Sequence, residues 1–111
     1  MKKPISNIAK EMALSVLNNN VSNDGFSLAL QFVHLAWNLA DEKEFKEEPA
    51  YIYGIKEFQG KLPSLQDEFI IKDVEKLVEK LMRYKLKHFP DDKRTIASCK
   101  NEDGKVKVKW F

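Results

Sequence analysis

The residues best placed to do chemistry are four polar ones in an otherwise apolar stretch, Gln31, His34, Asn38 and Asp41. Their three- and four-residue spacing puts them on one face of a helix. A histidine beside an amide and a carboxylate could polarise a water molecule or contribute to a metal site. One histidine without a second strong ligand makes a poor metal site. We therefore expect a hydrogen-bonded or solvated polar stripe, or part of a groove that binds a partner.

Two further groups have residue types that are used in catalysis. Cys99 and His88 could form a nucleophile and its base, but no motif surrounds either residue, and we expect Cys99 to be a half-buried structural residue. Asp91 and Asp92 could hold magnesium, as in a nuclease or phosphotransferase. Since no motif supplies a third carboxylate, we expect a polar turn in which one aspartate pairs with Arg94. No catalytic residue, metal or cofactor is predicted.

A row of lysines near the C-terminus is the main surface feature. Lys105, Lys107 and Lys109 alternate with apolar residues, so a β-strand would place all three on one face, about 6 to 7 Å apart. Such a row protects a sheet edge against aggregation, or it binds nucleic acid or an acidic protein surface. Trp110 should lie on the opposite face, which disfavours recognition of single strands by base stacking.

The charges are unevenly distributed along the chain. Residues 1–71 carry 7 lysines against 10 acidic residues, whereas residues 72–111 carry 12 lysines and arginines against 7 acidic residues. The first part includes an acidic segment that could bind a basic partner, formed by Glu42, Glu44, Glu47 and Glu48. The overall charge of +2 is too small to indicate nucleic-acid binding by itself.

Length and composition indicate one small cytosolic domain. The 111 residues suffice for one hydrophobic core, and a content of 43% hydrophobic and 32% charged residues is typical of a globular protein. A single cysteine permits no intramolecular disulfide, which favours a reducing compartment. The sequence has no signal-peptide pattern and no run of ~18 apolar residues, so we expect no membrane span. It also lacks a Gly-rich phosphate loop and the common hydrolase motifs.

Hydrophobic spacing predicts three helices, at residues 5–17, 26–40 and 65–89. The second is apolar around most of its circumference, which is typical of the central helix of a small domain. The third has the clearest apolar stripe, is expected to be the longest, and ends before Pro90. Residues 93–100 and 105–111 flank a turn sequence with Gly104 and predict a terminal β-hairpin.

Residues 51–58 are ambiguous between helix and strand. An isolated two-stranded hairpin is only marginally stable, so the predicted hairpin must pack on the helices or pair with a further strand, for which residues 51–55 are a candidate. The sequence thus predicts a single α+β domain over residues 1–111, with three to four helices and the C-terminal hairpin packed on the last long helix.

The lack of a catalytic motif favours a non-enzymatic module that binds another protein, such as an inhibitor, an immunity protein or an antitoxin-like partner of a bacterial or phage type. The acidic segment and the lysine row are its expected contact residues. Two alternatives stay open: a nucleic-acid-binding accessory protein that uses the basic hairpin, and a small nuclease that uses His34 or His88. The oligomeric state is not determined, and a homodimer is compatible with the sequence.

Overall fold

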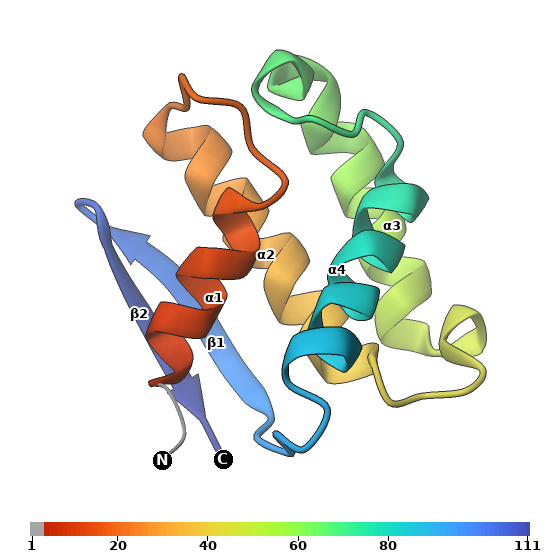
Figure 1. Cartoon of the computed structure of the whole chain (residues 1–111). Helices are drawn as coiled ribbons and strands as arrows, with labels where there is room; N and C mark the ends of the chain where they lie inside the picture. The colour runs from red at the N-terminus through yellow and green to blue at the C-terminus, as the bar shows by residue number, and fades with distance from the viewer. Residues whose placement is uncertain (1–3) are drawn as a thin grey trace.

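The computed structural model describes residues 4–111 and contains four helices followed by a two-stranded hairpin within that range (Figure 1). The elements are α1 Ile5–Leu14, α2 Asn23–Leu39, α3 Pro49–Lys61, α4 Val74–His88, β1 Ile96–Glu102 and β2 Lys105–Trp110. Three single 3-10 turns lie at Phe45–Glu47, Leu62–Ser64 and Gln66–Glu68. The predicted α+β class is confirmed, and residues 51–58 are helical.

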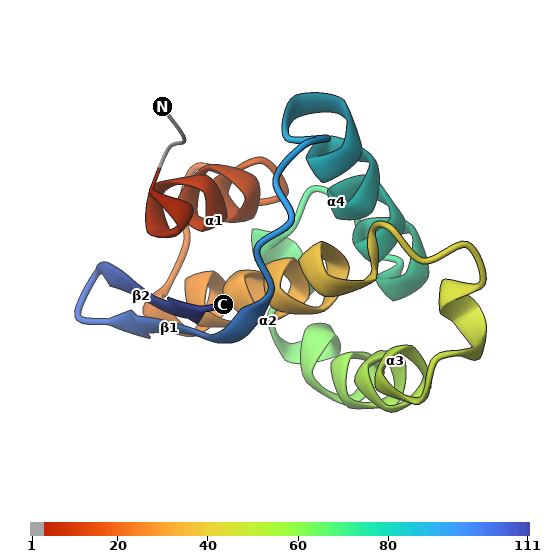
Figure 2. The same ribbon diagram turned by 90° about the horizontal axis from the view of Figure 1, so that it is seen from below.

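Helix α2 lies in the middle of the molecule, with α1, α3, α4 and the hairpin around it (Figure 2). Its apolar residues cover most of its circumference, and Leu30, Phe32, Val33 and Ala36 are completely buried. A helix that is apolar on nearly all sides is stable in water only when neighbours cover it on nearly all sides. The central position predicted from the sequence is therefore confirmed.

The start of α2 depends on a carboxylate that comes from a distant turn. The Ser22 hydroxyl accepts a hydrogen bond from the Gly25 backbone N–H at 3.0 Å, which is a standard N-cap. Glu68 in turn accepts hydrogen bonds from the backbone N–H and the hydroxyl of Ser22. A Cβ atom at Gly25 would lie 2.4 Å from Glu68 Oε1, so a larger residue there would displace this carboxylate.

The third predicted helix is shorter than expected. It was predicted over residues 65–89, but α4 begins only at Val74, where Asp73 caps it by accepting from the Lys76 backbone N–H at 3.0 Å. The apolar residues just before it are extended, because Phe69 forms an isolated β-bridge with Leu17. The prediction that this helix is the longest is also wrong, since α4 has 15 residues and α2 has 17.

The hairpin is confirmed, but it packs on other helices than expected. Strand β1 lies on α2 and β2 lies on α1, instead of resting on the last long helix, and the two strands form the whole sheet within residues 4–111. Residues 51–55 belong to α3 and do not pair with it. Asp103 and Gly104 have positive φ angles of 51° and 88°, as a tight hairpin turn requires.

Candidate functional site

The polar stripe of α2 is used largely to hold the hairpin. The Asn38 amide donates to the Ile96 carbonyl oxygen at 2.8 Å and accepts from the Ile96 N–H at 2.9 Å, so it pairs with β1 as a neighbouring strand would. Beside it, the Trp37 indole N–H donates to the Arg94 carbonyl at 2.6 Å. These three bonds fix the point where the chain enters β1, which gives the stripe a structural role at this end.

His34 and Gln31 lie further along the same stripe. His34 is half-buried, and burial lowers the pKa of its imidazole, while a hydrogen bond with the Ile96 backbone opposes this shift. Gln31 is exposed and accepts a hydrogen bond from Lys61 at 3.4 Å. Both residues border a hollow of about 330 Å³ between α2 and α3. Among residues 4–111, no group of three or more His, Cys, Asp or Glu side chains is placed to bind a metal ion.

Asp41, at the end of the stripe, neutralises a buried lysine. Its carboxylate lies 3.1 Å from the ammonium of Lys85, a side chain that is only 2% exposed, and 3.7 Å from that of Lys93. The hydrogen bond from Lys85 holds the pKa of Asp41 below its ordinary value. The Lys85 ammonium also lies 4.9 Å from the centre of the Trp37 ring. Asp41 therefore satisfies a charge inside the fold.

The remaining catalytic candidates have structural surroundings. Asp92 is buried and pairs with Arg94, whose Nε donates to Oδ1 at 2.9 Å, as predicted for this turn. Cys99 is buried in β1, and burial raises the pKa of its thiol to about 12. At neutral pH the thiol is therefore protonated. The ring of His88 packs against Tyr84, with ring centres 4.5 Å apart.

The acidic segment lies on the surface between α2 and α3. All four glutamates, Glu42, Glu44, Glu47 and Glu48, are exposed. Their carboxylates form no hydrogen bond or ion pair with another side chain of residues 4–111. Four carboxylates that are not used within the described fold remain available to a basic partner.

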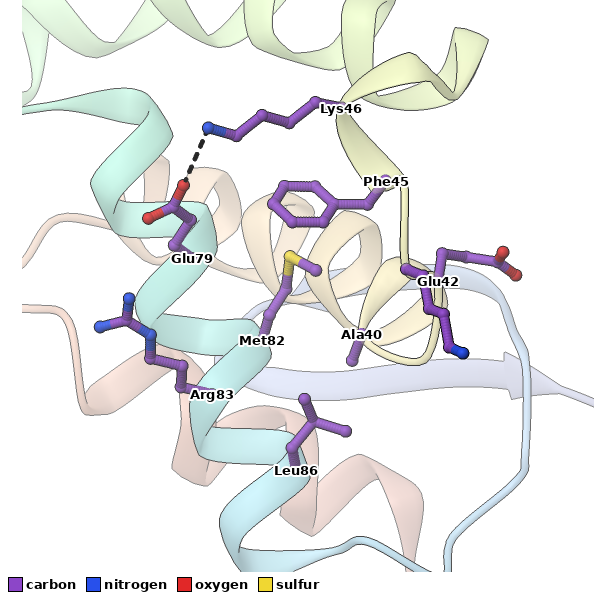
Figure 3. A pocket seen from close by; sticks show the side chains of 9 residues that line it. Ala40, Glu42, Phe45, Lys46, Glu79, Met82, Arg83 and Leu86 are labelled. Carbon is purple, nitrogen blue, oxygen red and sulfur yellow. Dashed lines mark ion pairs between the residues drawn. The ribbon is translucent and has the colours of Figure 1, made fainter.

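An apolar hollow of about 400 Å³ lies between this segment and α4 (Figure 3). Phe45 from the segment and Met82 and Leu86 from α4 supply its apolar surface, together with Ala40 from the end of α2. Leu86 is 43% exposed there. One end is crossed by an ion pair between Lys46 and Glu79, whose charged atoms are 3.5 Å apart. The hollow thus has an apolar floor and a charged rim.

Sequence reasoning did not find this hollow, because its residues come from segments far apart in the chain. The available signal was Phe45, the one apolar side chain in the charged run of residues 41–48. In the structure its ring packs edge-on against Tyr51, with centres 5.2 Å apart, which holds it at the rim. Leu86 faces the same hollow from α4.

The lysine row lies on the exposed face of the hairpin. Lys105, Lys107 and Lys109 are all exposed, whereas Val106 and Val108 are partly buried against the helices. The hairpin and the acidic segment lie at opposite ends of the molecule in both views (Figures 1 and 2). The two predicted sets of contact residues therefore belong to two separate surfaces.

Comparisons of the chain with protein-family models, with curated protein sequences and with solved structures found no match. Within residues 4–111, none of the helices combines the length and the apolar character that crossing a membrane requires.

Proposed function

We propose that this chain is a non-enzymatic, cytosolic protein-binding module, of the inhibitor, immunity or antitoxin-like kind, that docks a basic segment of another protein. The observation that carries the proposal is the apolar hollow beside the acidic segment. It combines an apolar floor, on which Leu86 is 43% exposed, with carboxylates that have no partner within the described fold.

The floor of the hollow suits one apolar side chain of the partner. Binding energy at protein interfaces is concentrated in a few anchors that fill pockets and lose their water. Phe45, Met82 and Leu86 provide such a pocket from two sides. A volume of about 400 Å³ leaves room for a large apolar side chain.

The acidic segment beside the hollow suits a basic partner, although the charged residues that line the hollow are mixed, with Glu42 and Glu79 against Lys43, Lys46 and Arg83. Residues 41–48 carry five carboxylates and two lysines. Asp41 already pairs with Lys85 and Lys93, so the four glutamates of the acidic segment are the carboxylates available to a partner. Complementary charge at the rim of an interface mainly raises the association rate and selects the partner. The expected ligand is thus a segment with lysines or arginines beside one large apolar residue.

The test is affinity capture from the native host followed by titration calorimetry with the purified candidate. The double variant Glu42→Lys/Glu44→Lys should raise the dissociation constant about tenfold or more at low salt, and this effect should shrink as salt rises. Leu86→Asp should weaken binding by about thirtyfold, the loss typical of a central anchor contact, with little dependence on salt.

The matched control is Glu57→Lys/Asp67→Lys, which makes the same charge change at two exposed residues outside the acidic segment. It should leave the dissociation constant within about twofold of the wild-type value, since surface charges at a distance are screened. A partner whose affinity falls as much with this control as with Glu42→Lys/Glu44→Lys would contradict the proposal. So would a partner that is indifferent to Leu86→Asp.

A further inference from the structure

The exposed face of the hairpin carries more positive charge than its sequence row alone indicates. In the strand register Lys100 of β1 lies directly opposite Lys107 of β2. Cross-strand partners point to the same face, so Lys100 joins Lys105, Lys107 and Lys109 there. All four are exposed, and none forms an ion pair with residues 4–111. Glu102, opposite Lys105, is the acidic residue within this register.

Protection of a sheet edge does not explain this arrangement. Lysines on β2 would suffice for its free edge. The outer edge of β1 is already occupied at Ile96, where Asn38 pairs with its N–H and carbonyl groups. Like charges directly opposite each other destabilise an antiparallel pair, so the position of Lys100 opposite Lys107 is unfavourable for the hairpin alone. Phosphate groups bound near the two ammonium groups would offset this repulsion.

We propose that this lysine face, Lys100, Lys105, Lys107 and Lys109, is a second binding site, which takes the phosphate backbone of a nucleic acid without reading its base sequence. Lysines are flexible point charges that contact phosphates well, and the face lacks arginine, whose planar fork gives the commonest two-point contact to a base. The site is independent of the hollow at the other end of the molecule.

The chemistry of the face favours nucleic acid over a protein or a membrane surface. The side chains between the lysines of β2 are Val106 and Val108, which are partly buried against the helices. Between its lysines the row therefore offers no apolar anchor of the kind that protein interfaces and membrane insertion need. The exposed aromatic residues, Trp110 at 52% and Phe111 at 77%, lie only at its C-terminal end. Phe111, which is 77% exposed, continues the alternation beyond Lys109 and could stack on one unpaired base.

The test is fluorescence anisotropy with a labelled duplex of mixed sequence and a labelled single strand of the same length. Four phosphate contacts predict that log K falls with log salt with a slope of about −3 to −4 on the duplex, so affinity drops about a hundredfold between ~50 and ~200 mM salt. Lys105→Glu/Lys107→Glu/Lys109→Glu should abolish binding at low salt. Single Lys→Gln changes should each reduce the slope by about one.

Two controls keep the test decisive. Lys56→Glu/Lys76→Glu/Lys80→Glu makes the same charge change at exposed lysines of α3 and α4 and should keep at least about half of the affinity, since distant charges are screened. The single change Lys107→Glu places a carboxylate opposite Lys100 and should weaken binding while raising the melting temperature, so its lost affinity is not caused by unfolding. The triple variant also places a carboxylate opposite Glu102, so its melting curve must show that it is folded at the assay temperature.

The two nucleic-acid forms distinguish the source of the phosphates. Tighter binding of the single strand that depends on Phe111 would assign the site to single strands, and equal or tighter duplex binding would assign it to double helices. The proposal is overturned if neither probe binds at low salt, or if binding survives reversal of the three lysines of β2. The hollow variant Leu86→Asp should leave the anisotropy unchanged, so this result and the protein-binding proposal can fail separately.

Discussion

Replacing Asn38 by alanine should loosen the hairpin from the helices. The side chain makes two hydrogen bonds to the Ile96 backbone, at 2.8 and 2.9 Å. A neutral hydrogen bond contributes about 0.5 to 1.5 kcal/mol to folding. Because Asn38 is exposed, water can replace part of each bond, so the expected loss for Asn38→Ala is about 1 to 2 kcal/mol.

The assay combines urea unfolding with hydrogen exchange of the Ile96 amide. A loss of about 1 kcal/mol corresponds to a fall of about 4 to 8 °C in melting temperature for a domain of this size. The Ile96 N–H is held by Asn38, so its exchange should accelerate by about tenfold more than that of amides in α4. The pair of readouts separates local release of β1 from a general loss of stability.

Two further variants control this prediction. Asn38→Asp keeps an acceptor for the Ile96 N–H but loses the donor to its carbonyl oxygen, so it should be destabilised as well. Gln31→Ala removes an exposed member of the same stripe, whose one hydrogen bond is 3.4 Å long, and should change stability by less than about 0.5 kcal/mol. A loss below about 0.3 kcal/mol for Asn38→Ala, with unchanged exchange at Ile96, would refute the reasoning.

Three other predictions follow from single contacts. In the wild type, Gly25→Ala should leave the unfolding free energy unchanged or lower it by up to about 1 kcal/mol, because the new methyl group displaces the Glu68 carboxylate. In a Glu68→Ala background the same change should raise the unfolding free energy by about 1 kcal/mol, because alanine has the higher helix propensity. A double-mutant cycle without this change of sign would contradict it. Tyr51→Phe should keep or raise the unfolding free energy by up to about 1 kcal/mol, since its buried hydroxyl has no hydrogen-bond partner within residues 4–111. If urea unfolding showed that Tyr51→Phe lowers the unfolding free energy by more than about 1 kcal/mol, the Tyr51 hydroxyl would have a hydrogen-bond partner after all. The lowered pKa of Asp41 stabilises the fold above the ordinary carboxyl pKa, and this contribution is lost as pH falls through the lowered value. Lys85→Met should therefore flatten the acid limb of a stability-against-pH curve, and an unchanged limb would exclude this pair as its cause.

Periodicity in the sequence identified α2, α4 and the hairpin because each depends on local patterns. An apolar stripe states which face of an element is buried, but not which neighbour covers it. The hairpin was therefore placed on the wrong helix. Val106 and Val108 are partly buried, as their alternation with the lysines predicts, whereas Trp110, expected on the same face, is 52% exposed. The position of the hairpin depends on Asn38 and Ile96, which are 58 residues apart. No local pattern encodes that contact.

The same limit explains the extended residues before α4. Their apolar character continues the helical stripe in sequence, so the helix was predicted to begin near residue 65. The structure uses them to form a backbone bridge between Phe69 and Leu17 instead. A bond between Ile70 N–H and the Val16 carbonyl, at 3.0 Å, holds the same stretch. Hydrogen bonding to a distant segment overrode a helical pattern that was locally consistent.

The sequence predicted which charged and polar residues belong to the candidate site, but not how they are arranged in three dimensions. The sequence revealed the acidic segment and the lysine row as charged runs, and it revealed the polar stripe of α2 by its spacing. It could not show that Asp41 is occupied by Lys85, or that Phe45 and Leu86 face one hollow. Those facts depend on how α2, the acidic segment and α4 meet in three dimensions.

The most direct test of the protein-binding role is selection of peptides from a random displayed library against the wild-type chain, with the Glu42→Lys/Glu44→Lys variant as soluble competitor. We predict that the selected peptides carry lysines or arginines beside one large apolar residue. When they are titrated into the labelled protein, the NMR shifts of Phe45, Met82 and Leu86 should change most. Peptides without basic residues, shifts confined to other surfaces, or a failure to enrich any peptide would contradict the account.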